Sequence, residues 1–516
     1  MSENKRIVKN SIILYARLLI TIIIGLYSSR IILLELGVED FGLYAVVGGI
    51  VSLMNLLSTT MVTTSIRFIA VEIGKKENKN PNKIFNSLLL LHITLSLVLL
   101  LVAETLGVWY VKNYLNAAIE KIPDALFVLR LSTFAAVIDS IIMPFQGLIT
   151  VHEKFSFKAL IEITHSLLHL GVVFLLIFHT GNKLRAYAMY VLVVHLFVAL
   201  AYFLYSRLKY AEIVKWKVNR NWNDYKSVSK FFGWQMVYVV GAVGSRQGGA
   251  IILNLFFGTA LNAAFGIANR VNEFILSFGR NLNQAAVPQI MKSYSGDNQE
   301  RSLMLIYKLS KFTFFIMLIP GVPILLSIDS ILVLWLKEVP KYTASFVVLM
   351  MFSGLLISLV NPLDVTIDAS GEIGKTKTIY TLLSLSSLPA AYFLFKLKFP
   401  PFSITLLVIF AQIIFIAVQA RILTTLTNFK ISDYFSKTLL PVGIVTLLVL
   451  PQFFLRFVFS EGIVNLFLIS LISLFLTIIT IYLAGLNKEE KMIIYSIIVN
   501  NRFIGRFLKK TKAWYL

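Results

Sequence analysis

The sequence has no cysteine among its 516 residues, which excludes disulfide bonds and thiolate metal sites. Charged residues are also scarce, at 14% of the chain against about 25% in a typical soluble domain. Hydrophobic residues instead make up 57% of the chain and include 40 phenylalanines. Because many apolar runs are long enough to cross a bilayer as helices, the composition predicts an all-α polytopic membrane protein.

The apolar runs predict about 14 transmembrane helices of about 20 residues each. Their spacing divides the chain into two six-helix lobes joined by a basic linker, followed by two C-terminal helices and a basic amphipathic cytoplasmic tail. The predicted ranges are 1–206 for the first lobe, 207–230 for the linker, 231–426 for the second lobe, 427–486 for the two further helices and 487–516 for the tail.

The formal net charge of +22 would fit nucleic-acid binding, so the positions of the charges have to decide the question. If the N-terminus is cytoplasmic, the inner connections hold roughly three times as many Lys and Arg residues as the outer ones. This bias predicts that both termini lie in the cytoplasm. Membrane topology and contact with anionic lipid then explain the charge, and nucleic acid is not an expected partner.

An internal repeat relates the two predicted lobes. Shifting the chain by 221 residues places Gly37 on Gly258 and aligns the starts of several spans. A matching turn follows Pro144 in the first lobe and Pro362 in the second. Since six helices is an even number, the lobes should share one orientation and be related by a pseudo-two-fold axis along the membrane normal. A substrate site is then expected between them.

The run over residues 259–290 has polar residues every three or four positions, which places them on one wall of a helix. These residues are Asn262, Gly266, Asn269, Arg270, Glu273, Ser277, Arg280, Asn281 and Gln284. An ionised side chain near the bilayer centre costs about 2.5–3.5 kcal/mol on insertion scales, so this wall should face a cavity or a protein interior. The structural alternative is that Arg270 pairs with Glu273 one turn away and only holds helices together.

Two further arginines are expected beside this wall, Arg246 on the preceding run and Arg17 on the first helix, because the repeat aligns their faces. The second helix has the same polar face without charge. Arg67, near its end, is expected to extend to the membrane interface. The residues predicted to bind substrate are Arg17, Arg246, Arg270, Arg280, Asn269, Glu273, Ser52 and Asn55.

Several arginines with few acids suit a multivalent anion, because guanidinium groups bind phosphate oxygens in bidentate geometry. The sequence shows no nucleophile–base pair, metal-ligand cluster or phosphate-binding glycine loop, so we expect no catalytic residue, metal, cofactor or enzyme activity. Candidates for coupling transport to a proton or Na⁺ are Glu104, Asp139, Asp364 and Asp368. His165 and His169 share a face with Glu162, which suits either a proton relay or a packed polar cluster.

Three segments carry a family resemblance: residues 29–44 (SRIILLELGVEDFGLY), 144–155 (PFQGLITVHEKF) and 369–375 (ASGEIGK). In them the chain resembles the bacterial polysaccharide flippases, the O-antigen (Wzx-type) transporters of the multidrug, oligosaccharidyl-lipid and polysaccharide exporter superfamily. The resemblance implies two six-helix lobes around a V-shaped cavity, with two extra C-terminal helices. It implies no role for the arginines, which rests on the helical pattern alone.

The resemblance also implies a function. Such a protein translocates an undecaprenyl-diphosphate-linked oligosaccharide from the inner to the outer leaflet of the bacterial inner membrane by alternating access. The expected partners are this lipid-linked oligosaccharide, membrane lipid, and the polysaccharide polymerase with its chain-length machinery. Two other classes stay open: a cation-coupled multidrug antiporter of the same fold, which would need acids to bind cations, and a membrane-embedded glycosyltransferase or polymerase, which would need paired catalytic groups or a large polar loop.

Overall fold

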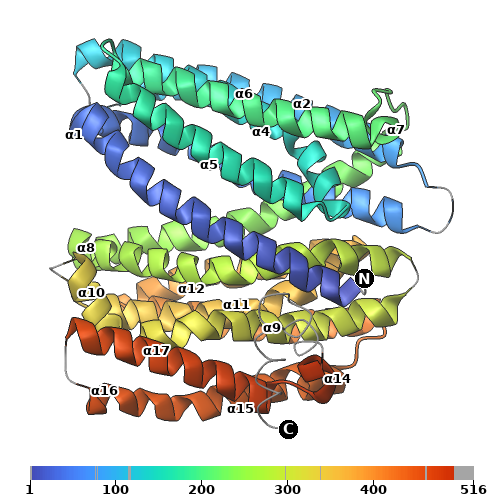
Figure 1. Ribbon diagram of the computed structural model, residues 1–516, viewed down its shortest axis with the longest axis vertical. Coiled ribbons are helices and arrows are strands. Elements are labelled where there is room, and N and C mark those ends of the chain that lie inside the picture. Colours follow the sequence, from blue (N-terminus) through green and yellow to red (C-terminus); the bar gives the residue numbers. More distant parts are fainter. Residues whose placement is uncertain are drawn as a thin grey trace, which may run out of the picture.

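The computed structural model describes residues 3–75, 77, 79–113, 115, 118–296, 298–336, 339–459 and 462–492. These residues form helices and no β-strand, which confirms the predicted all-α class. Figure 1 shows two helical lobes, one built from the N-terminal helices and the other from the helices that follow α7. Most of the predicted basic tail, from residue 493 onward, lies outside the described residues.

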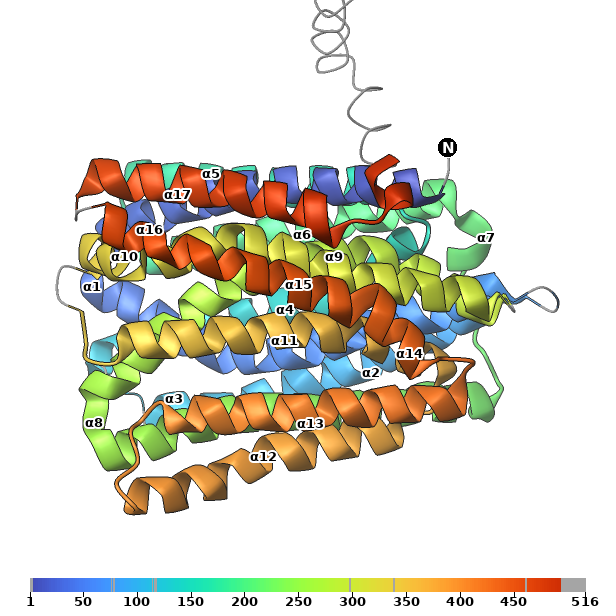
Figure 2. The ribbon, with the colours of Figure 1, turned by 90° about the horizontal axis from the view of Figure 1, so that it is seen from below.

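The helices of the first lobe are α1 Glu3–Gly74, α2 Pro81–Val102, α3 Val108–Asn113, α4 Ile122–Val151, α5 Phe155–Phe178, α6 Lys183–Lys209 and the short α7 Ala211–Val214. Those of the second lobe are α8 Trp222–Ser295, α9 Gln299–Leu326, α10 Ile328–Leu336, α11 Thr343–Ser370, α12 Gly374–Lys396 and α13 Ser403–Leu426. The chain continues through α14 Ile431–Tyr434, α15 Leu440–Val449, α16 Leu455–Val458 and α17 Ile463–Thr480. Figure 2 shows α15 and α17 lying against α9.

Eleven helices within the described residues are long and apolar enough to cross a membrane. The remaining predicted spans are the two halves of α1 and the second half of α8. These two helices are each broken at one glycine: Gly37 has φ 76° and ψ 170°, and Gly258 has φ 78° and ψ −174°. This backbone region is open essentially only to glycine. The 221-residue shift aligns these two glycines, so the sequence repeat corresponds to the same kink in both lobes.

A second repeated feature is the turn that follows a proline-containing helix in each lobe. Pro144 lies inside α4, and Pro362 lies inside α11. Each of these helices is followed by a residue of positive φ, Glu153 at 56° and Gly371 at 84°. The matched turns expected from the sequence therefore have related backbone conformations.

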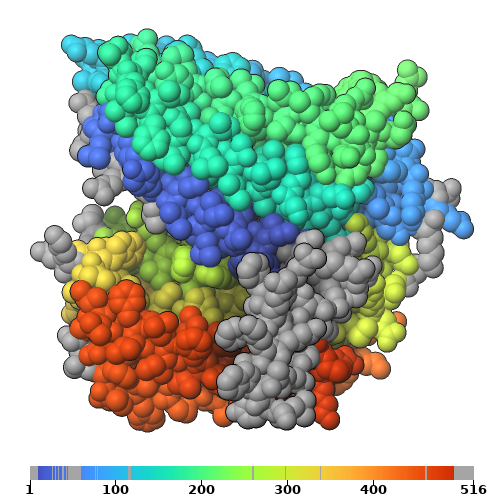
Figure 3. Space-filling model, viewed as in Figure 1, coloured from blue at the N-terminus to red at the C-terminus, as the bar shows by residue number. Residues whose placement is uncertain are grey.

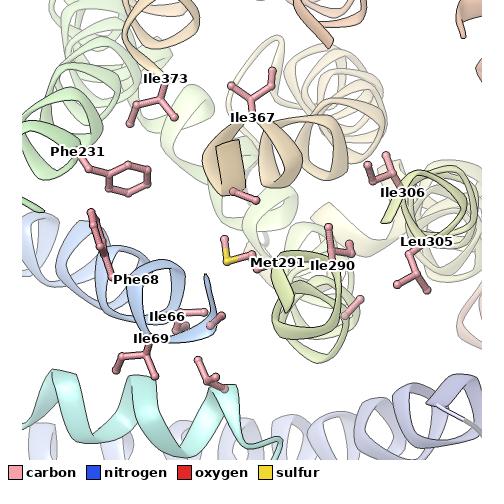
Figure 4. Close-up of a cluster of buried hydrophobic side chains, with 14 of the residues drawn as sticks. Ile66, Phe68, Ile69, Phe231, Ile290, Met291, Leu305, Ile306, Ile367 and Ile373 are labelled. Atoms are coloured by element: carbon pink, nitrogen blue, oxygen red, sulfur yellow. The ribbon is translucent and has the colours of Figure 1, made fainter. Parts of the chain in front are cut away.

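The two lobes pack together at the end of the molecule where α4 and α11 terminate. One buried cluster there takes side chains from both lobes, including Ile69, Met291 and Ile367. In Figure 4, Phe68 of α1 faces Phe231 of α8, and their ring centroids lie 5.7 Å apart. We call this region the closed end. Toward the opposite end each lobe has a hydrophobic cluster of its own.

Two cationic side chains form hydrogen bonds from one lobe to the other at the closed end. Arg67 of α1 donates from Nε to the carbonyl oxygen of Asp368 (3.1 Å) and from Nη2 to that of Ala369 (3.4 Å). Lys292 of α8 donates to the carbonyl oxygen of Val151, the last residue of α4. Each cation thus binds the C-terminal carbonyls of a helix in the other lobe, where the helix dipole favours positive charge.

The contacts of Arg67 correct the expectation that this side chain extends to the membrane interface. Its guanidinium group instead lies 4.3 Å from the ring centroid of Phe68 and 5.0 Å from that of Phe231. The sequence showed an arginine at the end of an apolar run. It did not show that another lobe would cover that end.

Replacing Gly258 by Ala should lower the free energy of unfolding by about 1–3 kcal/mol, because an L-residue is strained in this backbone region. Gly266→Ala on the same helix is the matched control. An added Cβ meets no atom within 4 Å at either position, and only Gly258 departs from helical geometry. The control should be neutral or stabilising by up to about 1 kcal/mol. The Tm of each purified variant tests this, and equal values would show that the kink does not require glycine.

Candidate functional site

Helix α1 of the first lobe contacts helix α8 of the second lobe near Arg17. Tyr15 donates its hydroxyl proton to the carbonyl oxygen of Phe278 (2.7 Å), and the two rings stack. Arg17 donates to the side-chain oxygen of Asn281 (2.8 Å) and forms an ion pair with Glu162 of α5. The charge of Arg17 is therefore balanced inside the protein. Of the predicted substrate residues, this one links the lobes rather than offering a free cation.

Beyond this contact, three arginines and one acid lie on α8. Nη1 of Arg280 lies 2.9 Å from the carboxylate of Glu273, and Nη1 of Arg246 lies 3.8 Å from the same carboxylate. The predicted alternative, a pair between Arg270 and Glu273, is wrong, because Arg270 is exposed and has no hydrogen-bond or ion-pair partner among the described residues. We call Arg246, Arg270, Glu273 and Arg280 the α8 wall.

The α8 wall has an excess of positive charge, and its charged side chains are largely uncovered by the rest of the protein. Arg246, Glu273 and Arg280 are 46%, 47% and 56% exposed in their side chains. About eight residues of helix, or roughly 12 Å, separate Glu273 from the contact that Asn281 makes with Arg17. Figure 3 shows that the surface between the two lobes is hollowed. The structure thus places an arginine-rich wall beyond the point where the lobes meet.

A cavity of about 250 Å³ opens beside this wall inside the second lobe. Its lining includes Arg246 and Glu273 together with neutral polar groups from α8, α11, α12 and α13: Ser245, Asn269, Asn272, Ser353, Tyr380, Ser384, Thr405 and Gln412. The side chain of the predicted residue Asn269 donates to the carbonyl oxygen of Phe265 (2.9 Å). The predicted residues Ser52 and Asn55 lie on α1, but their side chains are outside the described part of the chain.

Of the predicted coupling acids in the first lobe, Glu104 lies 3.3 Å from Nε of Arg130 on an exposed surface. Asp139 is the acceptor for Nδ1 of His195 at 3.0 Å. The ring of His195 lies 5.6 Å from that of His165 between centroids. Glu162, the acid that the sequence placed on one face with His165 and His169, is paired with Arg17.

The two coupling acids of the second lobe, Asp364 and Asp368, share one buried lysine. Nζ of Lys377 lies 2.6 Å from the carboxylate of Asp364 and 3.1 Å from that of Asp368, and its side chain is only 1% exposed. Gln419 donates to Asp364 and Gln235 donates to Asp368, both at 3.1 Å. These acids are therefore occupied by internal partners.

The sequence did not single out Lys377 or Lys292 as residues of special interest. Both lie in segments predicted as cytoplasmic connections, where lysine is ordinary. Lys292 binds Val151 from 141 residues away in the sequence, so no local pattern could have indicated this contact.

No protein-family model and no curated protein matches the sequence. Solved structures do resemble the fold. A structure of MATE in complex with MaL6 matches with a TM-score of 0.69 at 15% identity, over 81% of this chain and 95% of that one. An outward-facing multidrug resistance MATE family transporter of the MOP superfamily matches with a TM-score of 0.68 at 14% identity, over 81% and 94%.

A third similar structure is a MOP superfamily transporter from Pyrococcus furiosus, with a TM-score of 0.66 at 14% identity over 81% of this chain and 94% of that one. At these identities the similarity establishes the fold. The chain is therefore a multi-pass membrane protein with the fold of the MATE transporters of the MOP superfamily.

Proposed function

We propose that this chain is a flippase for an undecaprenyl-diphosphate-linked oligosaccharide, the repeat unit of an O-antigen, capsule or exopolysaccharide. The observation that carries the proposal is the charge of the α8 wall. Arg246 and Arg280 share the single carboxylate of Glu273, and Arg270 has no partner within the described residues. A cleft with this excess of positive charge attracts an anion and repels a cation.

A diphosphate linkage suits these arginines chemically. Each guanidinium group has five N–H donors in a planar arrangement that matches two oxygens of a phosphate. Arg246 and Arg280 use only part of this capacity on Glu273, while Arg270 uses none on the described side chains. The neighbouring polar cavity supplies hydroxyl and amide groups of the kind that bind sugars. The resemblance of three segments to polysaccharide flippases supports the same substrate.

A multidrug antiporter is the second candidate, and the similarity to a multidrug resistance MATE transporter favours it. A transporter of cationic drugs needs an acidic side chain that is available to bind them. Here Asp364 and Asp368 bind Lys377, and Asp139 binds His195. The fold does not set the sign of the site, since the Pyrococcus furiosus transporter is described as having a binding pocket of reverse polarity that suggests a different function.

The position of the closed end determines the direction in which the cleft opens in the proposed transport cycle. If the N-terminus is cytoplasmic, the lobes are joined on the cytoplasmic side and the α8 wall faces an outward-open cleft. Moving a negative head group outward across an inside-negative membrane releases roughly 2.3 kcal/mol per charge per 100 mV. The pair of Asp139 and His195 is our candidate for proton coupling, because His165 continues the polar path from it.

Replacing Arg270 by Ala should reduce flipping about tenfold or more, because a charged hydrogen bond contributes about 1.5–3 kcal/mol. The assay measures leaflet exposure of an undecaprenyl-diphosphate-linked oligosaccharide in proteoliposomes, with and without an imposed potential. Arg421→Ala is the matched control, since Arg421 is an exposed arginine on α13 outside the α8 wall. Unchanged transfer would refute the role of Arg270. Uptake of an organic cation with no transfer of any lipid-linked sugar would replace the flippase by the antiporter.

Replacing Asp139 by Asn should remove the dependence of transport on a pH gradient while transport driven by the membrane potential remains. The reason is that the amide of Asn cannot take up a proton or stabilise a protonated His195 at its 3.0 Å contact. Transport in the same proteoliposomes is measured under a pH gradient and under a potential separately. Glu104→Gln, which removes the exposed partner of Arg130, is the control. A gradient dependence that survives in the Asp139 variant would eliminate this pair as the coupling site.

A further inference from the structure

A second cavity, of about 760 Å³, lies at the closed end and is separate from the α8 wall. It is bounded by α1 of the first lobe and by α8, α12 and the turn before α12 in the second lobe. Its lining includes three aromatic side chains and three cations: Phe68, Phe231, Trp234, Arg67, Lys230 and Lys375. We call it the basal cavity.

The cations of the basal cavity have little negative charge to balance them. Glu372 is the one acid among the lining residues. Lys230 and Lys375 have no hydrogen-bond or ion-pair partner among the described residues, and both are exposed. Asp364 and Asp368 of α11 are paired with Lys377. Three cations around one cavity with a single lining carboxylate favour an anionic occupant.

The backbone adds to this preference. Helix α12 begins at Gly374, and no side chain caps its first N–H groups. The indole ring of Trp234 packs against Gly374, where an added Cβ would lie 2.9 Å from the ring. Uncapped N–H groups at the start of a long helix favour negative charge, and they lie beside the same cavity as the cations.

We propose that the basal cavity binds a phosphate group, carried either by the head group of an anionic lipid or by a small phosphate ester. Arg67 would hold it from the first lobe, and Lys230 and Lys375 from the second. An occupant that binds both lobes stabilises the closed end, so this site would regulate the conformational change instead of carrying the transported substrate. The proposal does not depend on the nature of the substrate at the α8 wall.

The absence of cysteine permits a site-specific test. Ser227→Cys places a single thiol in the lining of the basal cavity, and Ser229→Cys places one on the exposed surface of the same helix as the matched control. A neutral maleimide labels each purified protein in phosphatidylcholine nanodiscs. The probes are phosphatidylglycerol added to the nanodisc and glycerol 1-phosphate added to the buffer. Thr378→Cys, elsewhere in the lining, repeats the measurement if Ser227→Cys does not fold.

Labelling at the cavity thiol should slow about tenfold with a phosphate-bearing probe, the effect of about one charged hydrogen bond, and the control thiol should not change. Protection by phosphatidylglycerol alone would identify a lipid head group, and protection by glycerol 1-phosphate as well would identify a general phosphate site. Lys230→Gln with Lys375→Gln should abolish the protection, whereas Lys209→Gln on α6 should not. No protection by either probe, or protection that persists without both lysines, would overturn the proposal.

Discussion

The C-terminal carbonyl groups of α4 and α11 are the constraint on which the arrangement of the two lobes depends. A helix leaves its last four carbonyls without partners in the helix, and a buried carbonyl without a partner is costly. Arg67 and Lys292 supply the donors, each from the lobe opposite to the helix that it binds. An apolar cluster that includes Val151 and Ala369 packs beside both contacts. The closed end is therefore held together both by these hydrogen bonds and by apolar packing.

The helix ends that are bound occur in two related copies because the lobes are repeats, but the cations are not repeated, since the 221-residue shift places Arg67 on Pro288 and not on Lys292. The chemistry of the cleft is not repeated either. The 221-residue shift that superposes Gly37 on Gly258 places Arg270 on Gly49, so the repeat keeps the backbone and changes the charge. A symmetric scaffold allows one lobe to move relative to the other around a shared contact. An asymmetric wall gives the cleft its preference for one sign of charge. The fold is thus shared with the MATE structures, while in the proposed function the substrate class would depend on a few side chains of α8.

The features that could be predicted from the sequence are those set by local backbone chemistry. The 221-residue shift aligned Gly37 with Gly258, and the structure has a kink at each of them in a conformation that other residues avoid. The partners of charged side chains could not be predicted in the same way. Spacing allowed a pair between Arg270 and Glu273 as the structural alternative, but the kink at Gly258 brings Arg246 from the other half of α8 to that acid. The contact of Arg246 depends on this tertiary approach, whereas the closer pair of Arg280 and Glu273 joins residues two turns apart on one helix. The roles of Ser52 and Asn55 stay predictions.

Opening the closed end requires these interlobe bonds to break, and this requirement limits what could drive the proposed transport. A hydrogen bond from a charged donor contributes about 1.5–3 kcal/mol, so the two cation contacts together resist opening by several kcal/mol. A ligand can shift such an equilibrium only by its difference in affinity between the two states. Helix α8 carries both the arginines of the α8 wall and Lys292. An anion that neutralises the wall therefore acts on the same helix whose end must release Val151. In the proposed function, binding in the cleft and opening at the far end would be two events on one helix, and the second half of α8, beyond Gly258, is the part that would connect them.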